Sequence, residues 1–343
     1  MQNLLTRFRR DLHQIPELDR QVPETLAYVE AALAPLPCRL FHPIPQALCA
    51  FFDGGKADTV GFRAELDALP IQEAEGRGYG SRHPGCMHAC GHDGHMAMLL
   101  GLAHAWEAVR DSLPHNLLLI FQPAEETTGG AADICSQGVL DEYRVSRIFG
   151  CHLWPGLPEG RAFARPGPMM ARSSEVTLTI RGRSVHIANR QQGNDALLAG
   201  AEFLRAAYAF MDAGFPPAEP RVLGFGRMES GQVRNALSDH TRLEGTLRVF
   251  NDQVFAQAQQ GLQALAEETA AQQGCQAALA FSPGYPPLLN DPALVALAGD
   301  LLCPPPCPQH DHGRFFLFCP SPAQLVFLPG SGGTSCPPAQ PGL

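Results

Sequence analysis

Short apolar segments alternate with helix-forming segments through the first 165 residues, and this alternation constrains the fold more than any other feature of the chain. The apolar segments have the length and the Gly, Asp and Pro boundaries of buried strands, and they lie at residues 47–53, 59–66, 116–122 and 145–154. Residues 96–109 are predicted to form a buried helix, and residues 1–35 two further helices. Strands that alternate with helices predict an α/β domain with a mostly parallel central sheet.

The pattern changes near Arg165. Strictly alternating strands and amphipathic helices replace the apolar runs over residues 166–283. We expect this segment to form a separate α+β domain of four strands and two helices. Its insertion divides a catalytic domain into a first part, residues 1–165, and a final part, residues 284–343.

Charge and composition exclude several classes of function. The chain carries 25 Lys and Arg against 34 Asp and Glu, a net charge of −9, and has no basic run that would follow a phosphate backbone. Its one lysine, Lys56, precedes Ala57, which excludes a Walker A loop and disfavours Schiff-base catalysis. No stretch reaches the roughly 18 apolar residues of a membrane span. The 11 cysteines lack disulfide-framework spacing, so we expect a cytoplasmic protein that binds neither nucleic acid nor membranes.

The densest group of ionisable side chains lies in residues 87–95, MHACGHDGH, between a glycine-rich loop and the predicted helix. Cys90 and His92 are separated by one residue, and a thiolate with an imidazole at this spacing suits zinc or a similar divalent ion. Ordinary surface polarity is the alternative interpretation. The unusual density of Cys, His and Asp favours a metal site.

Further candidates follow the predicted strands. Glu125 and Glu126 come directly after one apolar run, His152 ends another, and Asp67 follows a third, where it could orient a ligand. Sites in α/β sheets lie at the carboxyl ends of strands, so these side chains are expected to converge. Cys90, His92, Glu126 and His152 together would supply a mixed set of metal ligands, with Glu125 left as a base. This is the inventory of a metal-assisted hydrolase. The alternative interpretations are solvated loop charge for the two glutamates and an ordinary hydrogen-bonded polar residue for His152.

Six segments in chain order resemble the hippurate-hydrolase, aminoacylase and auxin-conjugate-hydrolase group of di-metal amidohydrolases: LHQIPEL, FRAELDALPIQE, GCMHACGHDGHMAMLLG, FQPAEETTGGA, GCHLWPGLPEG and GRSVHIA. The resemblance implies hydrolysis of the amide bond of N-acyl amino acids with up to two divalent ions, of zinc, manganese or nickel. It implies that Glu125 is the general base and that Asp67 lies behind the ligands. The ligands that it implies are Cys90, His92, Glu126 and His152.

The same resemblance implies a zinc-peptidase-like catalytic domain with an inserted lid or dimerisation domain, and a homodimer formed through that insert. On the lid, it implies that His186 polarises the scissile carbonyl, while Asn235 and Arg248 contact the carboxylate of the substrate. An arginine suits this task because its planar fork can bond both carboxylate oxygens.

The chain departs from the family pattern at two places. Glu65 stands where Asp is usual, and His310 and His312 replace Glu and Phe near the end of the chain. The late histidine that serves the family as a fifth ligand has no counterpart before Leu343. Two alternatives follow: a member that binds N-acyl amino acids without cleaving them, and a small structural zinc site made of Cys303, Cys307, His310 and His312.

Overall fold

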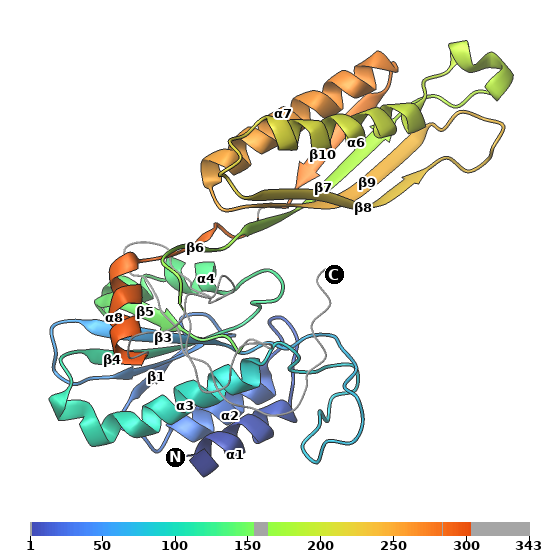
Figure 1. Ribbon diagram of the computed structural model, residues 1–343. Helices are drawn as coiled ribbons and strands as arrows, with labels where there is room; N and C mark the ends of the chain where they lie inside the picture. The colour runs from blue at the N-terminus through green and yellow to red at the C-terminus, as the bar shows by residue number, and fades with distance from the viewer. Residues whose placement is uncertain (1, 154–163, 283, 303–343) are drawn as a thin grey trace. The chain divides into compact units, whose positions relative to one another are not determined.

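The structure, a computed structural model, describes residues 2–153, 164–282 and 284–302 (Figure 1). The chain divides into two compact units, one made of Met1–Gly167 with Leu289–Leu343 and the other of Pro168–Leu288. They are called the first and the second unit below. Among the residues described, no helix combines the length and the apolar character needed to cross a bilayer.

A five-stranded mixed sheet forms the centre of the first unit. In the order β1-β2-β4-β3-β5, its strands are β1 (Arg39–Phe41), β2 (Leu48–Phe52), β4 (Asn116–Gln122), β3 (Thr59–Glu65) and β5 (Val145–Gly150). β3 runs parallel to β4 and β5, whereas β2 pairs antiparallel with both β1 and β4. The expectation of a mostly parallel sheet is therefore wrong for two of the four pairings. Residues 42–47 allow only a hairpin between β1 and β2, because a parallel crossover needs a dozen residues or more.

Helices α1, α2 and α3 lie together on one side of this sheet (Figure 1). They span Gln2–His13, Pro23–Leu33 and His92–Val109 and share one hydrophobic core with β2 and β4, in which Leu12, Leu100 and Phe121 are fully buried. The shorter helices of this unit are η1 (Arg110–Ser112), α4 (Ala131–Ser136) and α5 (Val139–Glu142), and α8 (Pro292–Leu302) follows the second unit.

Helix α3 begins four residues earlier than its apolar pattern indicates. Gly91, at the helix N-cap, has a φ of +89°, a left-handed conformation that glycine adopts without strain. The polar residues His92, Asp93 and His95 then form the first helical turn and are buried. Apolar periodicity could not reveal this turn, because its buried side chains are polar and are satisfied by partners from other elements.

The second unit is a four-stranded antiparallel sheet with two long helices on one face (Figure 1). The strands are β10 (Gln276–Phe281), β7 (Arg172–Arg181), β9 (His240–Val249) and β8 (Arg221–Ser230), in that order, and the helices are α6 (Ala196–Ala213) and α7 (Asp252–Gln272). Its core includes Leu178, Phe203 and Leu262. The remaining elements are η2 (Ile187–Gln192) and the pair β6 (Gly167–Met170) and β11 (Leu288–Asn290).

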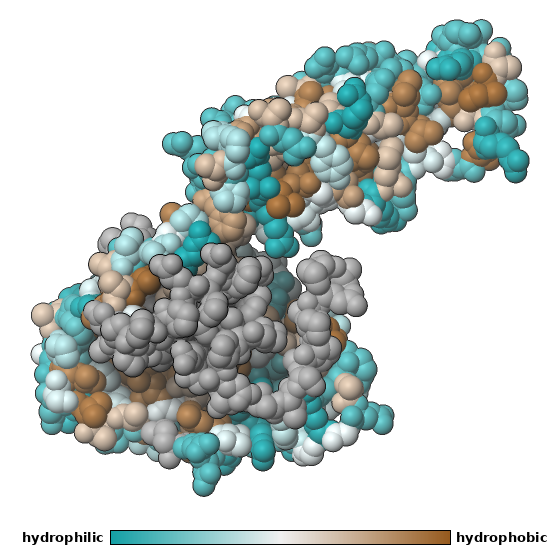
Figure 2. Space-filling model, viewed as in Figure 1, coloured by the Kyte–Doolittle hydropathy of each residue, from teal (hydrophilic) through white to brown (hydrophobic). Residues whose placement is uncertain are grey.

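The surface of the second unit carries several exposed apolar side chains. Val222 and Met228 lie on the edge strand β8, with exposed fractions of 62% and 37%, and Leu197 of α6 is 50% exposed. Figure 2 shows hydrophobic residues in brown among the hydrophilic ones on the visible face of this unit. An edge strand with unpaired backbone groups and apolar side chains is suited to pairing with another chain.

Candidate metal centre

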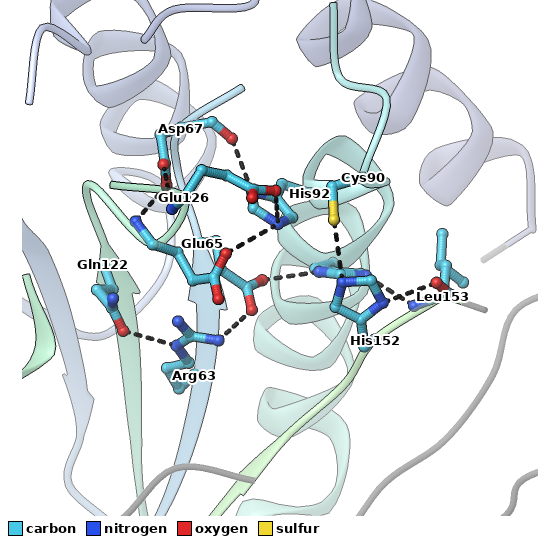
Figure 3. A network of polar contacts seen from close by, with 11 residues as sticks. Arg63, Glu65, Asp67, Cys90, His92, Gln122, Glu126, His152 and Leu153 are labelled. Atoms are coloured by element: carbon cyan, nitrogen blue, oxygen red, sulfur yellow. Dashed lines mark hydrogen bonds and ion pairs between the residues drawn. The ribbon is translucent and has the colours of Figure 1, made fainter. Parts of the chain in front are cut away.

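The parallel strands of the first unit end at one edge of the sheet, and the polar side chains gather there (Figure 3). β3 ends at Glu65 and is followed by Asp67, β4 is followed by Glu125 and Glu126, and β5 by His152. The left-handed turn at Gly91 brings Cys90 and His92 to the same edge.

His92 occupies the centre of this group. Its Nδ1 donates a hydrogen bond to the backbone carbonyl of Asp67 at 2.7 Å, which leaves Nε2 unprotonated in the neutral ring. Nε2 is buried and has no hydrogen-bond partner within the described part of the chain. It lies 3.6 Å from Oε1 of Glu126 and 3.9 Å from Oε2 of Glu125. A buried lone pair that faces two carboxylates is unfavourable unless a cation lies between them, so the arrangement is suited to a bound cation.

Cys90 and His152 lie on the other side of His92 (Figure 3). The Nδ1 of His152 donates to the carbonyl of Leu153 at 2.7 Å, and its Nε2 lies 3.3 Å from the Sγ of Cys90. Burial lowers the pKa of His152 to about 3, and burial together with Glu126 raises the pKa of the Cys90 thiol. Both groups are thus neutral without a cation, and a neutral imidazole is the form that binds metals.

Three sets of three potential ligands share His92 among the described residues. In each set, one donor atom from every residue lies within 4.8 Å of the others: Cys90, His92 and His152 form the first set, His92, Glu125 and Glu126 the second, and Glu65, His92 and His95 the third. The structure therefore brings together all four of the predicted ligands. The donor types, one sulfur, two nitrogens and carboxylate oxygens, suit zinc and similar ions.

The carboxylates carry opposed electrostatic influences. Burial raises the pKa of Glu125 to about 7, the charge of His92 in its protonated form opposes the rise, and the charge of Glu126 adds to it. For His92, burial lowers the pKa, but the charges of Glu65, Glu125 and Glu126 together raise it above the ordinary value. The Glu125 side chain is still 36% exposed, so it can reach both the buried ligands and solvent.

Asp67 connects the two ligand segments. Its carboxylate accepts hydrogen bonds from the backbone N–H groups of Glu125 at 2.9 Å and Glu126 at 3.0 Å. Its backbone carbonyl accepts the hydrogen bond from Nδ1 of His92. The residue is fully buried. It lies behind the predicted ligands, where its carbonyl holds the ring of His92 and its carboxylate holds the backbone of Glu125 and Glu126.

Two buried residues of the site received no role from the sequence. Glu65 accepts a hydrogen bond from Nδ1 of His95 at 2.7 Å and pairs with Arg63, which in turn donates to Gln122. Although burial opposes ionisation, Arg63 and His95 hold the pKa of Glu65 well below its usual range. The spacing of His92 and His95, three residues apart on one helix, was the available signal that their rings are neighbours.

The predicted substrate-binding residues all lie in the second unit. His186 caps η2, with its Nδ1 accepting from the backbone N–H of Ala188 at 3.2 Å, and its neighbour Ile187 donates to the carbonyl of Asn235. Arg248 is exposed near the far end of β9, so the length of the strand separates it from His186 and Asn235. The predicted zinc site at Cys303, Cys307, His310 and His312 lies outside the described residues.

Comparison with known proteins gives a consistent result. Residues 61–338 match the sequence profile described as peptidase family M20/M25/M40. The chain is 35% identical over 299 residues to an N-acetyldiaminopimelate deacetylase of Limosilactobacillus fermentum, covering 85% of this chain and 77% of that one. It is 33% identical over 303 residues to an N-acetyl-L-cysteine deacetylase of Bacillus subtilis, covering 88% and 72%.

A solved structure supports the same relationship. A dinuclear metal-binding peptidase of the M20 family from Bacillus subtilis superimposes with a TM-score of 0.75 and 30% sequence identity, covering 86% of this chain and 77% of that one. An aminopeptidase PepT from Bacillus cereus has a TM-score of 0.65 at 15% identity, which is a likeness of fold alone.

Proposed function

Because the chain belongs to peptidase family M20/M25/M40 and is a metal-dependent hydrolase, we propose that it cleaves the amide bond of N-acyl amino acids to a carboxylic acid and a free amino acid. The names of the two deacetylases support this substrate class. The observation that carries the proposal is the buried Nε2 of His92, which has no hydrogen-bond partner among the described residues and lies between Cys90 and His152 on one side and two glutamates on the other.

Up to two divalent ions are bound, and zinc, manganese and nickel are the candidates. The residues that would hold them are Cys90, His92, Glu126 and His152. A divalent ion in this position supplies Lewis-acid polarisation of the amide carbonyl and makes a nearby water more acidic. Asp67 keeps the donor atoms in place by its three hydrogen bonds to the ligand segments.

Glu125 acts as the general base. Its carboxylate takes the proton of the attacking water and then returns it to the nitrogen of the leaving amine. A group that does both must bind a proton with intermediate strength near neutral pH. The raised pKa of about 7 and the partial exposure of the side chain are both suited to this role.

The second unit would serve as lid and dimerisation domain. In this role His186 polarises the scissile carbonyl, and Asn235 and Arg248 bind the carboxylate of the substrate. The exposed apolar residues on the free edge strand β8 support a homodimer formed through this unit. We place the enzyme in the cytoplasm, where thiols such as those of Cys38, Cys49 and Cys86 remain reduced.

The direct test is hydrolysis by purified protein that has been stripped of metal and reloaded with zinc, manganese or nickel. N-acetyl, N-benzoyl and N-acetyl-diaminopimelate substrates would be compared, with release of the free amino acid as the readout. We expect turnover that a chelator abolishes and added metal restores. Metal binding and substrate binding without any turnover would instead support the alternative of a member that binds N-acyl amino acids without cleaving them.

A further inference from the structure

His152 lies beyond the last pairing of its strand. The register of β5 with β3 ends at Arg63 and Gly150, so the ladder does not extend to residues 151–153. A ligand on such a segment needs other contacts to hold its ring in one direction, because metal sites tolerate little misplacement.

His95 supplies one of these contacts. The backbone N–H of Leu153, the residue directly after His152, donates to Nε2 of His95 at 2.8 Å. Since Nε2 accepts, the proton of the neutral ring is on Nδ1, and Nδ1 donates to Glu65 at 2.7 Å. Both nitrogens of His95 are therefore engaged, which leaves neither for a metal ion.

Leu153 in turn sets the direction of the His152 ring. The Nδ1 of His152 donates to the carbonyl of Leu153, so that Nε2 faces Cys90. The rings of His95 and His152 also meet edge to face, with centroids 4.7 Å apart. The Leu153 side chain lies directly over α3: a Cβ atom at Gly94 would be 2.6 Å from its Cδ1.

We propose that His95, held in one tautomer by Glu65, is a positioning residue that fixes Leu153 and thereby aims Nε2 of His152 at the metal. The chain of contacts begins at Arg63 in β3, passes through Glu65 and His95, and ends at the ligand. Every side chain before the ligand is largely buried. The inference rests on the proposed function in one respect, namely that His152 is a metal ligand.

Two substitutions separate the two hydrogen bonds of His95. His95→Gln places an amide oxygen near the position of Nε2 and keeps an acceptor for Leu153. His95→Asn places its amide near Nδ1, keeps the contact with Glu65 and leaves the N–H of Leu153 without its acceptor. His104→Asn is the matched control, since His104 is on the same helix and stacks on Phe8 outside the site.

The measurement is the zinc affinity of the metal-stripped proteins, by competition with a chromophoric chelator, together with their melting temperatures. We expect His95→Asn to weaken zinc binding about 10-fold or more, as loss of a residue that orients a ligand does in other metal sites. His95→Gln should lose much less zinc affinity, and His104→Asn should lose none. Hydrogen exchange of the Leu153 amide should be slow in the wild type and in His95→Gln, and fast in His95→Asn.

Several results would overturn the inference. Wild-type zinc affinity in His95→Asn would show that His95 does not position the ligand, while the proposed function would stand. Equal losses of zinc affinity in both variants, with slow hydrogen exchange of the Leu153 amide in both, would show that His95 does not act through Leu153. Failure of the wild type to bind any of zinc, manganese and nickel would overturn both proposals. Should His95→Asn not fold, fast exchange of Leu153 in the wild type would still refute the inference.

Discussion

The metal centre of the first unit and the predicted substrate-binding residues of the second unit are built in opposite ways. His92, Asp67 and His95 are buried and held by hydrogen bonds from several elements. His186, Asn235 and Arg248 are exposed, and the length of β9 separates Arg248 from the other two. Buried, hydrogen-bonded side chains keep their geometry without a substrate, whereas exposed side chains gain a binding geometry only when a substrate or another surface contacts them.

This comparison predicts different effects of substitution in the two regions. Changes in the metal centre should affect chemistry, metal binding or stability. Substitutions at the exposed predicted substrate-binding residues of the second unit should affect substrate binding and leave stability unchanged, because exposed residues rarely contribute to stability.

The largest effect is expected for Glu125→Gln. The amide cannot accept the proton of water, so kcat should fall about 100- to 10,000-fold, the usual contribution of general acid–base catalysis. Metal content, measured by elemental analysis, should remain that of the wild type. Glu107→Gln, on the exposed face of α3, is the control and should retain full activity. Wild-type turnover by metal-loaded Glu125→Gln would disprove its role as base.

Arg248→Ala should act on binding. Loss of a charge-assisted hydrogen bond of about 1.5–3 kcal/mol corresponds to a rise in KM of about 10- to 100-fold for substrates with a free carboxylate. Unfolding should be unchanged, because Arg248 is exposed. Arg181→Ala, an exposed position on the neighbouring strand β7, is the control. An unaltered KM in steady-state kinetics would remove Arg248 from the substrate site.

Asp67→Asn should act on stability. An amide has one oxygen where the carboxylate uses two, so one of the N–H groups of Glu125 and Glu126 loses its acceptor. We expect the free energy of unfolding of the metal-free protein to fall by about 1–3 kcal/mol in urea denaturation. A change as small as that of Arg248→Ala would contradict the contrast between the two units.

The smallest effect concerns pH and His13 of α1. Burial lowers the pKa of His13, but its hydrogen bonds to Asp93 at 2.8 Å and Glu73 at 3.0 Å raise it above 6.5 overall. A histidine whose pKa is higher in the folded than in the unfolded state stabilises the folded state at pH values below its unfolded-state pKa. This contribution is lost as the pH rises through the folded-state pKa. One pKa unit corresponds to about 1.4 kcal/mol.

The stability difference between wild type and His13→Gln should therefore be larger at pH 5.5 than at pH 8.5, as measured by urea denaturation at the two pH values. The two pH values follow from the ordinary histidine pKa of 6.5 and from the upward direction of the pKa shift in the folded protein. The reverse order, or equal differences at both pH values, would show that His13 is not a more basic residue in the folded protein.

Much of the site could be predicted from the sequence. The proximity of Cys90, His92, Glu126 and His152 could be predicted, because these residue types stand next to apolar runs and the carboxyl ends of parallel strands share an edge. The direction of β2 could not be predicted. An apolar run indicates that a strand is buried on both faces of a sheet. It does not indicate whether the strand runs parallel or antiparallel to its neighbours.

The sequence by itself determined which donor atoms are available and that they follow buried strands. Only the tertiary structure decided which atoms are occupied: within the described ranges Nε2 of His92 accepts no hydrogen bond, whereas Nε2 of His95, three residues later, accepts one from the backbone of Leu153. The two residues are chemically identical. Their difference arises from partners distant in the chain, because a hydrogen bond depends on distance and direction in space and not on neighbouring letters.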